Sequence, residues 1–471
     1  MIKINLTITP QSLKAKIDRF FNISGLKILQ YEKIWDPDMG SPVYTKEGKY
    51  TSRGWTEWTQ GFQFGSAILQ FDVTSDSAFL EIGRRNTIKY MPVHVSHVGV
   101  HDHGFNNIST FGNLLRLMNE GKIKESEWER NYYELALKIS GAVQARRWTQ
   151  LREGGGFIYS FNGPHSLFAD TIRSLRVLAV SHQLGHALLE ENDRKVNLLD
   201  RLINHMTTTA NYSIYYGDKK DSFDIRGRVA HESIFNCNDG TYRCPNSQQG
   251  YSPFTTWTRG LAWIMCGFAE QLEFLSSLHD EELHPYGGKN RIEHMILKAV
   301  QATCDYYIDS TPSDGIPYWD TGAPLLYKLG DFLHQPADPY NEYEPVDSSA
   351  ATIAAQGLLR LGQYLKNKGI IEDGERYWQA GLTVLDTLLQ SPYLNENENH
   401  QGLILHSIYH RPNGWDYIPH GKKNPCNESS MWGDYHAREV ALYIRRIIKL
   451  EPYLTFFKKN TNNKYDGVSL S

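Results

Sequence analysis

The chain has 471 residues, 40% of them hydrophobic and 22% charged, with a formal net charge of -4. A chain of this length can bury a large core. The small net charge and the lack of a Lys/Arg run exclude the electrostatic footprint of a nucleic-acid or anionic-membrane binder. No stretch of sequence approaches the length of a membrane span. We therefore expect neither nucleic acid nor membrane as a partner.

The cysteines and the first residues bear on the compartment. The five cysteines are an odd number without a CxxC pair, which is typical of reduced thiols. Residues 1–14 lack the basic region, apolar region and cleavage site of a signal peptide. We expect a cytoplasmic protein that is a monomer or a homodimer. A periplasmic location would follow if a signal peptide had been removed.

The predicted elements repeat along the chain. Six times a polar or aromatic opening runs directly into an apolar helix rich in small residues. The openings are residues 58–62, 101–105, 170–172, 257–260, 347–350 and 432–435, and the helices after them cover residues 63–69, 106–117, 173–184, 261–275, 351–364 and 436–450. Amphipathic, charge-rich helices with one apolar stripe are predicted at residues 12–31, 77–90, 125–143, 194–208, 290–308 and 373–389.

Alternating inner and outer helices predict an all-α fold, an (α/α)6 barrel whose six helix pairs bury each other around a ring. We expect one catalytic domain over residues 1–460 and a disordered tail at residues 461–471. In a barrel the six openings converge, so one cleft should be faced by Trp58, Asp102, Asp170, Arg259, Asp347 and Asp434. The alternative is a helical solenoid in which these residues cap helices, which explains Asp and Ser but not the repeated Trp and Arg.

Two carboxylates, Asp102 and Asp170, begin successive inner helices in apolar surroundings. Two acids in one cleft are the minimum set for glycosidic chemistry, because one can be kept protonated while the other stays ionised. A single Asp at a helix start is more often an N-cap. The matching positions of the two in successive repeats favour catalysis.

Residues 249–263 place an amide, a phenol, an indole and a guanidinium where a loop enters a helix. Gln249, Tyr251, Trp257 and Arg259 suit a sugar acid, since the planar fork pairs with a carboxylate and the rings lie against a pyranose. The alternative is that the tryptophans are core residues and Arg259 is a surface charge. Four further arginines are interpreted as solvated surface charges, with a sulfate or carboxylate site as the alternative: Arg173, Arg176, Arg226 and Arg228.

The histidines at positions 94, 97, 101 and 103 alternate with valines and lack a familiar zinc spacing. We expect no metal and no cofactor, and interpret the cluster as hydrogen-bonding imidazoles around Asp102. His231 lies alone in a long polar loop, where a histidine is usually at the surface. Serine, cysteine and lysine nucleophile motifs are absent from the sequence, which argues against acyl transfer.

These stretches together resemble the unsaturated glucuronyl hydrolases of glycoside hydrolase family 88, and more distantly the unsaturated rhamnogalacturonyl hydrolases. The resemblance runs from about Trp55 to Tyr443. It rests on the segments His101-Asp102-His103-Gly104-Phe105, Phe168-Ala169-Asp170, Gln249-Gly250-Tyr251, Trp257-Thr258-Arg259-Gly260-Leu261-Ala262-Trp263, Asp347-Ser348-Ser349-Ala350 and Trp432-Gly433-Asp434-Tyr435.

The resemblance implies an (α/α)6 barrel that hydrates the C4=C5 bond of a terminal unsaturated uronic acid on lyase-generated oligosaccharides. It implies that Asp170 is the general acid/base and that Asp102 assists it. It also implies a set of residues that bind the unsaturated sugar, namely His231, Gln249, Trp257 and Arg259. To these the sequence adds Tyr251, Trp58 and His101.

Two other kinds of function stay open at the level of sequence. The first is a uronate-polysaccharide lyase or an exo-β-glucuronidase on the same scaffold. A lyase would use Arg259 or Asn236 to neutralise the carboxylate and Tyr251 or His231 as the base. The second is a non-catalytic helical toroid that binds sugar. Retention of both Asp102 and Asp170 favours the hydrolase.

Overall fold

The computed structural model describes residues 1–54 and 58–458. Trp55, where the family resemblance begins, and the predicted tail at residues 461–471 lie outside the described residues. Within the described ranges, no helix has the length and the apolar character that crossing a membrane requires.

Six helical segments form a closed inner ring. They are α2 (Gln60–Thr74), α5 (His103–Asn107) continued by a π-helical turn (Ile108–Gly112) into α6 (Asn113–Asn119), a 3-10 helix (η3, Ala169–Ser174) leading into α8 (Leu175–Gln183), α10 (Thr258–Ser277), α13 (Ser348–Asn367) and α15 (Met431–Ile448). Each segment packs against the next, and α15 packs against α2, which closes the ring. Nearly every residue of α10, α13 and α15 is buried, as expected for helices that are covered on all sides.

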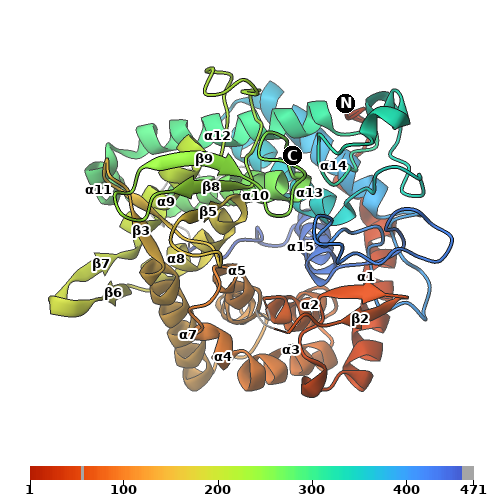
Figure 1. Cartoon of the computed structure of the whole chain (residues 1–471). Helices are drawn as coiled ribbons and strands as arrows, with labels where there is room; N and C mark the ends of the chain where they lie inside the picture. The colour runs from red at the N-terminus through yellow and green to blue at the C-terminus, as the bar shows by residue number, and fades with distance from the viewer. Residues whose placement is uncertain (55–57, 459–471) are drawn as a thin grey trace.

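Six further helices surround this ring (Figure 1). They are α1 (Pro10–Ile34), α3 (Ser77–Tyr90), α7 (Glu127–Arg146), α9 (Leu198–Tyr212), α12 (Lys289–Ser310) and α14 (Ile371–Leu388), and two short helices, α4 (Pro92–Val95) and α11 (Asp280–Leu283), lie in the connections. The predicted (α/α)6 barrel is confirmed. Only α9 begins well after its predicted start, because residues 195–197 form a strand and Asn197 caps the helix.

Nine short strands in four small antiparallel sheets, which the sequence did not indicate, occupy the loops of the described chain. They pair as β1 (Tyr44–Lys46) with β2 (Lys49–Thr51), β3 (Trp148–Gln150) with β4 (Gly156–Ile158), β6 (Ala187–Leu189) with β7 (Lys195–Asn197), and β5 (Ser166–Phe168) with β8 (Glu232–Phe235) and then β9 (Tyr242–Asn246). In the last sheet Phe168 pairs with Glu232, and the Ala169 amide donates to the His231 carbonyl at 2.8 Å. This register places His231 beside Asp170.

The interior of the barrel contains buried ion pairs. Arg176 Nη2 lies 2.9 Å from Glu439 Oε1, and Arg173 Nε lies 3.4 Å from Glu270 Oε2. All four side chains are at most 2% exposed. The interpretation of these two arginines as surface charges is therefore wrong, and their charges are neutralised inside the barrel. Arg228 is likewise buried and pairs with Asp221 at 2.7 Å, whereas Arg226 is exposed and pairs with Asp305.

The end of the barrel where the inner helices finish is closed by residues 451–458. Arg360 on α13 donates to the Leu454 carbonyl at 3.1 Å. The ring of Phe456 lies 4.5 Å from the guanidinium of Arg176, and the ring of Phe457 lies 5.3 Å from that of Phe274. The opposite end, where the inner helices begin, is therefore the end that can admit a ligand.

Candidate active site

His101 connects the two predicted catalytic carboxylates. Its Nε2 lies 3.1 Å from Asp170 Oδ2, and its Nδ1 lies 3.8 Å from Asp102 Oδ2. Gly104 makes this possible, since a Cβ there would lie 2.5 Å from the Cβ of Ser174. The close approach of α5 to η3 lets Ser174 donate to the His101 carbonyl at 2.5 Å and brings residues from two different repeats together.

Neither carboxylate caps its helix. Asp102 stands at the N-cap of α5 without a capping hydrogen bond from its side chain, and Asp170 lies in the first turn of η3. They are 9% and 6% exposed. Asp170 Oδ1 and His101 Nδ1 are buried and have no hydrogen-bond partner among the described residues. The N-cap alternative is thus excluded for both aspartates, and Asp170 keeps one oxygen available for a ligand.

The surroundings push the pKa values of the two acids in opposite directions. Burial and the charge of Asp170 raise the pKa of Asp102, although His101 opposes the rise. Burial also acts to raise the pKa of Asp170, but the charge and hydrogen bond of His101 outweigh it, and the pKa is lowered. The same two carboxylates overcome the burial of His101 and raise its pKa. Two acids whose pKa values are shifted in opposite directions are typical of acid/base sites.

His231 is a buried, neutral donor and not a surface residue. Its Nδ1 accepts from the amides of Gln248 and Gln249 at 3.0 and 3.1 Å. Burial lowers its pKa to about 3. With Nδ1 acting as an acceptor, the proton of the neutral ring is on Nε2, which is buried and has no partner in the described residues. The ring lies between Phe168 and Trp257, with centroid distances of 4.5 and 4.6 Å.

Arg259 is 2% exposed and lies between the rings of Trp257 and Trp432, at 4.6 and 5.1 Å. Its Nη1 donates to Asp347 Oδ2 at 2.6 Å and to the Ile408 carbonyl. Its Nη2 donates to Gln249 Oε1 at 3.0 Å and to the Tyr409 carbonyl at 2.7 Å.

All four Nη hydrogens of Arg259 therefore have partners inside the protein. This argues against the direct hydrogen bonds from Arg259 to a substrate carboxylate that we expected. The arrangement instead makes Arg259 a residue that holds Gln249 and the segment 408–409 in place.

Tyr409 and Trp415, which sequence reasoning missed, join the predicted Trp58 and Trp432 in an aromatic part of the site. Tyr409 lies 5.2 Å from Trp432 and 5.2 Å from Trp415, and Trp58 stacks on Trp432 at 5.0 Å. Burial raises the pKa of the Tyr409 phenol, and the Tyr409 carbonyl accepts from Arg259 at 2.7 Å. Tyr409 therefore belongs to the aromatic side of the site. Its position between Ile408 and His410 in a loop carries no helix-opening signal that could have identified it.

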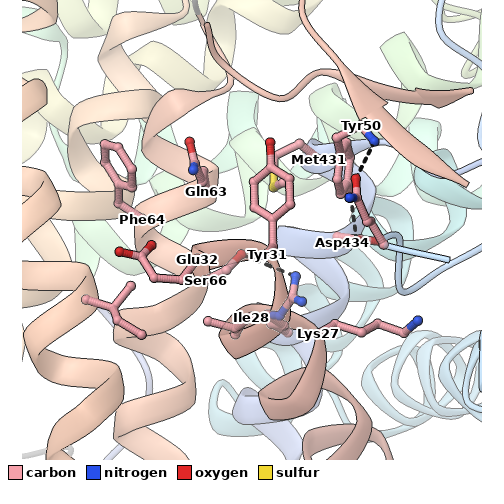
Figure 2. A pocket seen from close by; sticks show the side chains of 13 residues that line it. Lys27, Ile28, Tyr31, Glu32, Tyr50, Gln63, Phe64, Ser66, Met431 and Asp434 are labelled. Carbon is pink, nitrogen blue, oxygen red and sulfur yellow. Dashed lines mark hydrogen bonds between the residues drawn. The ribbon is translucent and has the colours of Figure 1, made fainter. Parts of the chain in front are cut away.

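Two of the six converging residues do not face the cleft. Asp347 is fully buried, caps α13 through the amides of Ser349 and Ala350, and pairs with Arg259. Asp434 accepts from the Tyr50 hydroxyl at 2.6 Å and from the amides at 403 and 404. It lines a separate cavity of about 40 Å³ between α1, α2 and α15 (Figure 2). For these two aspartates the prediction was wrong, because helix amides and Arg259 satisfy Asp347 and loop amides satisfy Asp434.

Tyr251 lies at the edge of the site with its side chain 50% exposed, while its amide donates to the buried Asp320 at 2.8 Å. Its hydroxyl makes no hydrogen bond to a described residue that would tie it to the acid pair. Of the predicted binding residues, His101 contacts both acids, His231 lies beside Asp170 and Trp257 packs on His231. Gln249 and Arg259 are bonded to each other.

One ligand atom from each of His101, Asp102 and Asp170 lies within 4.8 Å of the others, so the trio has the spacing of a cation site. Two observations weigh against that use. His101 and Asp170 are joined by a direct hydrogen bond. A metal ligand has to be a neutral imidazole, whereas the pKa of His101 is raised. The trio fits a shared proton better than a metal ion. Of the other histidines, His97 bonds to His103 at 2.7 Å, away from this trio.

No family model matches the chain, but relatives and solved structures of similar fold do. An unsaturated chondroitin disaccharide hydrolase of Streptococcus agalactiae is 22% identical over 392 residues, which cover 82% of this chain and 81% of that protein. The crystal structure of the unsaturated glucuronyl hydrolase of Bacillus sp. GL1 matches with a TM-score of 0.67 at 20% identity, covering 90% of this chain and 96% of that one.

A variant of the Streptococcus agalactiae unsaturated glucuronyl hydrolase, complexed with dGlcA-GalNAc6S, matches with a TM-score of 0.63 at 17% identity, covering 94% of this chain and 96% of that one. The fold and the curated relatives place the chain in the class of α/α-barrel glycoside hydrolases. The narrower resemblance to the unsaturated glucuronyl hydrolases, which the motifs indicate, is confirmed.

Proposed function

We propose that the chain is an unsaturated glucuronyl hydrolase, which hydrates the C4=C5 bond of a terminal unsaturated uronic acid on lyase-generated oligosaccharides and so releases that uronate. The observation that carries the proposal is the buried pair Asp102 and Asp170 joined by His101, with Asp170 Oδ1 left without a protein partner. The pair lies at the open end of the barrel. The similar proteins are named as hydrolases of unsaturated chondroitin disaccharides and of unsaturated glucuronyl groups.

The chemistry needs one proton and one water molecule. An enol ether takes up a proton at C4, and water adds at C5 and gives up a proton. The resulting hemiketal opens, which breaks the bond to the rest of the saccharide. A group that first donates a proton and then accepts one from water ends the reaction unchanged, so one carboxyl suffices as acid and base.

We assign this group to Asp170, because its Oδ1 is available while its Oδ2 is held by His101. In the free protein its pKa is lowered and that of Asp102 is raised, so Asp102 holds a proton more readily than Asp170 does. A bound uronate brings a further negative charge, which raises the pKa of both acids and favours protonation of Asp170. Asp102 then serves as the neighbour that keeps the proton within the pair.

The remaining residues suit recognition of the sugar. His231 offers an Nε2–H beside Asp170, and Gln249 keeps its amide nitrogen for a ligand because Arg259 occupies its oxygen. Trp257 and Trp58 provide aromatic surface for the ring. Tyr251, being half exposed, would contact the more distant part of an oligosaccharide.

The geometry disfavours the lyase. His231 accepts two amide hydrogens at Nδ1 and carries its proton on Nε2, so it has no lone pair for the C5 proton. Tyr251 is at the edge of the site, and the side-chain oxygen of Asn236 accepts from the amide of Asn238 in its own turn. An inverting glucuronidase is also disfavoured, since oxygens of the two acids lie within 4.8 Å and inversion needs roughly 6.5–9.5 Å between the carboxyls.

The test follows the ultraviolet absorbance of the C4=C5 bond. With unsaturated disaccharides the wild-type protein should remove the absorbance, and Asp170→Asn should lower kcat by about 10²–10⁴-fold with an unchanged circular dichroism spectrum. Gain of absorbance on an intact uronate polysaccharide would establish a lyase and overturn the proposal. Retention of full activity in Asp170→Asn would remove the assigned acid/base.

Compartment and assembly complete the proposal. The five cysteines, all in the described part of the chain, are free thiols, which supports the cytoplasmic location expected from the sequence. We expect a monomer or a homodimer, which sedimentation of the purified protein distinguishes.

A further inference from the structure

Arg53 presents a positive charge at the aromatic side of the site. It follows β2 in the first hairpin and is exposed. Its Nη2 donates to the Trp415 carbonyl at 3.0 Å, and its guanidinium lies 5.0 Å from the ring of Trp415 and 5.7 Å from that of Tyr409. A guanidinium supported by two rings and one carbonyl is held in a defined position with its remaining N–H groups directed elsewhere.

No described carboxylate forms an ion pair with Arg53, in contrast to the other arginines considered for anion binding. Arg259 pairs with Asp347 at 2.6 Å, and Arg228 pairs with Asp221 at 2.7 Å. Arg176 is closed inside the barrel with Glu439. The charge of Arg53 is therefore available to a ligand, whereas theirs is neutralised.

Tyr409 connects Arg53 to Arg259 and the aromatic part of the site. Arg53 lies over the Tyr409 ring, and the Tyr409 carbonyl accepts from Arg259. The Tyr409 ring lies 5.2 Å from that of Trp432, and Trp432 stacks on Trp58 and lies 5.1 Å from the Arg259 guanidinium. Arg259 in turn holds Gln249, whose amide donates to His231 beside Asp170. A sugar bound against these rings would carry its substituents toward Arg53.

We propose that Arg53 is a specificity-determining residue that binds an anionic group of the saccharide, a carboxylate or a sulfate. The inference rests on the proposed function and deepens it. An unsaturated uronate carries a carboxylate on C5, for which Arg259 has no Nη hydrogen left. The adjoining sugar of an acidic oligosaccharide can carry a sulfate or a second carboxylate. Both sources offer the same charged oxygens, which a planar guanidinium binds with two parallel hydrogen bonds.

The experiment measures binding separately from turnover. Unsaturated disaccharides are titrated into Asp170→Asn protein, with and without Arg53→Gln, and tryptophan fluorescence reports occupancy. Three ligands separate the sources: an unsulfated disaccharide, its uronate methyl ester and a sulfated disaccharide. Lys46→Gln is the matched control, because it removes one exposed positive charge from the same hairpin, where Lys46 lies over Tyr417 and not over Tyr409.

We expect Arg53→Gln to weaken binding of the charged ligand by about ten-fold or more, the usual effect of losing a charge-assisted hydrogen bond. Lys46→Gln should change it less than about two-fold, and Arg53→Lys should recover part of the loss. If the bound group is the uronate carboxylate, the methyl ester binds equally to both proteins. If it is the sulfate, the loss appears with the sulfated ligand alone.

Equal affinity of the Arg53→Gln and parent proteins for all three ligands would overturn the inference. Because affinity is measured on a protein without its acid/base, this result is independent of whether the wild-type protein hydrates the double bond. Absence of hydration by the wild type, with binding that still depends on Arg53, would overturn the proposed reaction and leave the anion site in place.

Discussion

The Nε2 atom of His101 lies 3.1 Å from Oδ2 of Asp170, and this contact controls the charge of the acid pair. The histidine is fully buried between two carboxylates, which raise its pKa and keep it protonated to higher pH. The resulting positive charge lowers the pKa of Asp170.

Replacing His101 by Gln tests this control. Loss of the imidazolium should raise the pKa of Asp170. If the free protein needs Asp170 ionised, activity is lost as pH falls through that pKa, so the acidic limb of the profile of kcat/KM against pH should move to higher pH. A pKa shift of one unit lowers kcat/KM about ten-fold on that limb. His182→Gln, which removes a histidine paired with Glu282 at the C-terminal end of α8, is the control. If the acidic limb of the pH profile does not move in His101→Gln, His101 does not set the charge of Asp170.

Replacing Arg259 by Met should destabilise the protein and disturb the site together. The change leaves Asp347 buried without its partner and releases Gln249 and the carbonyls at 408 and 409. We expect the free energy of unfolding to fall by about 3–5 kcal/mol. Urea denaturation measures it, and the KM for an unsaturated disaccharide should rise because Gln249 is no longer fixed. A variant with native stability and native KM would contradict the role of Arg259 as a positioning residue.

The ion pairs inside the barrel should matter for stability and not for substrate binding. Glu439→Gln leaves Arg173 and Arg176 without one of their two buried counter-charges. Removing one partner of a buried pair costs about 3–5 kcal/mol of unfolding free energy. Glu396→Gln breaks an exposed pair with Arg19 and should cost no more than about 1 kcal/mol. Denaturation measures the loss of unfolding free energy in both variants. Equal losses would refute the expected difference between the buried and the exposed ion pairs.

Asp416 should make the stability of the protein depend on pH. Its side chain accepts from the amides of Tyr409 and His410, and burial raises its pKa to about 6. A raised pKa means that the folded state holds the proton more tightly, so this stabilisation is complete below the unfolded pKa near 4 and is lost as pH rises through about 6.

Asp416→Asn stays neutral and keeps an acceptor for these amides, so its Tm should fall less than that of the wild type between pH 4 and pH 7. Burial also raises the pKa of Asp314 and Asp320 to about 6, and part of the decline should therefore remain. Scanning calorimetry at several pH values gives the two curves. Parallel curves would mean that Asp416 does not titrate in this range.

The six helix openings could be predicted because their signals are local. Small residues within an apolar run identify a helix that is covered on all sides, and a single apolar stripe identifies an outer helix. Asp347 shows the limit of this reasoning. Like Asp102, it stands at the opening of an inner helix, yet it caps α13 and pairs with Arg259, whereas the side chain of Asp102 caps no amide of α5.

The sequence by itself determined the barrel, the residues at its open end and the family that they resemble. Only the tertiary structure decided which of those residues are free to act. Asp170 keeps an unpartnered oxygen, while loop amides far away in sequence satisfy Asp434. The same holds for the cations, since Arg259 is neutralised by Asp347 and Arg53 is not neutralised by any described carboxylate. The physical reason is that availability of a polar group depends on its hydrogen-bond partners, and here these come from loops that only folding brings together.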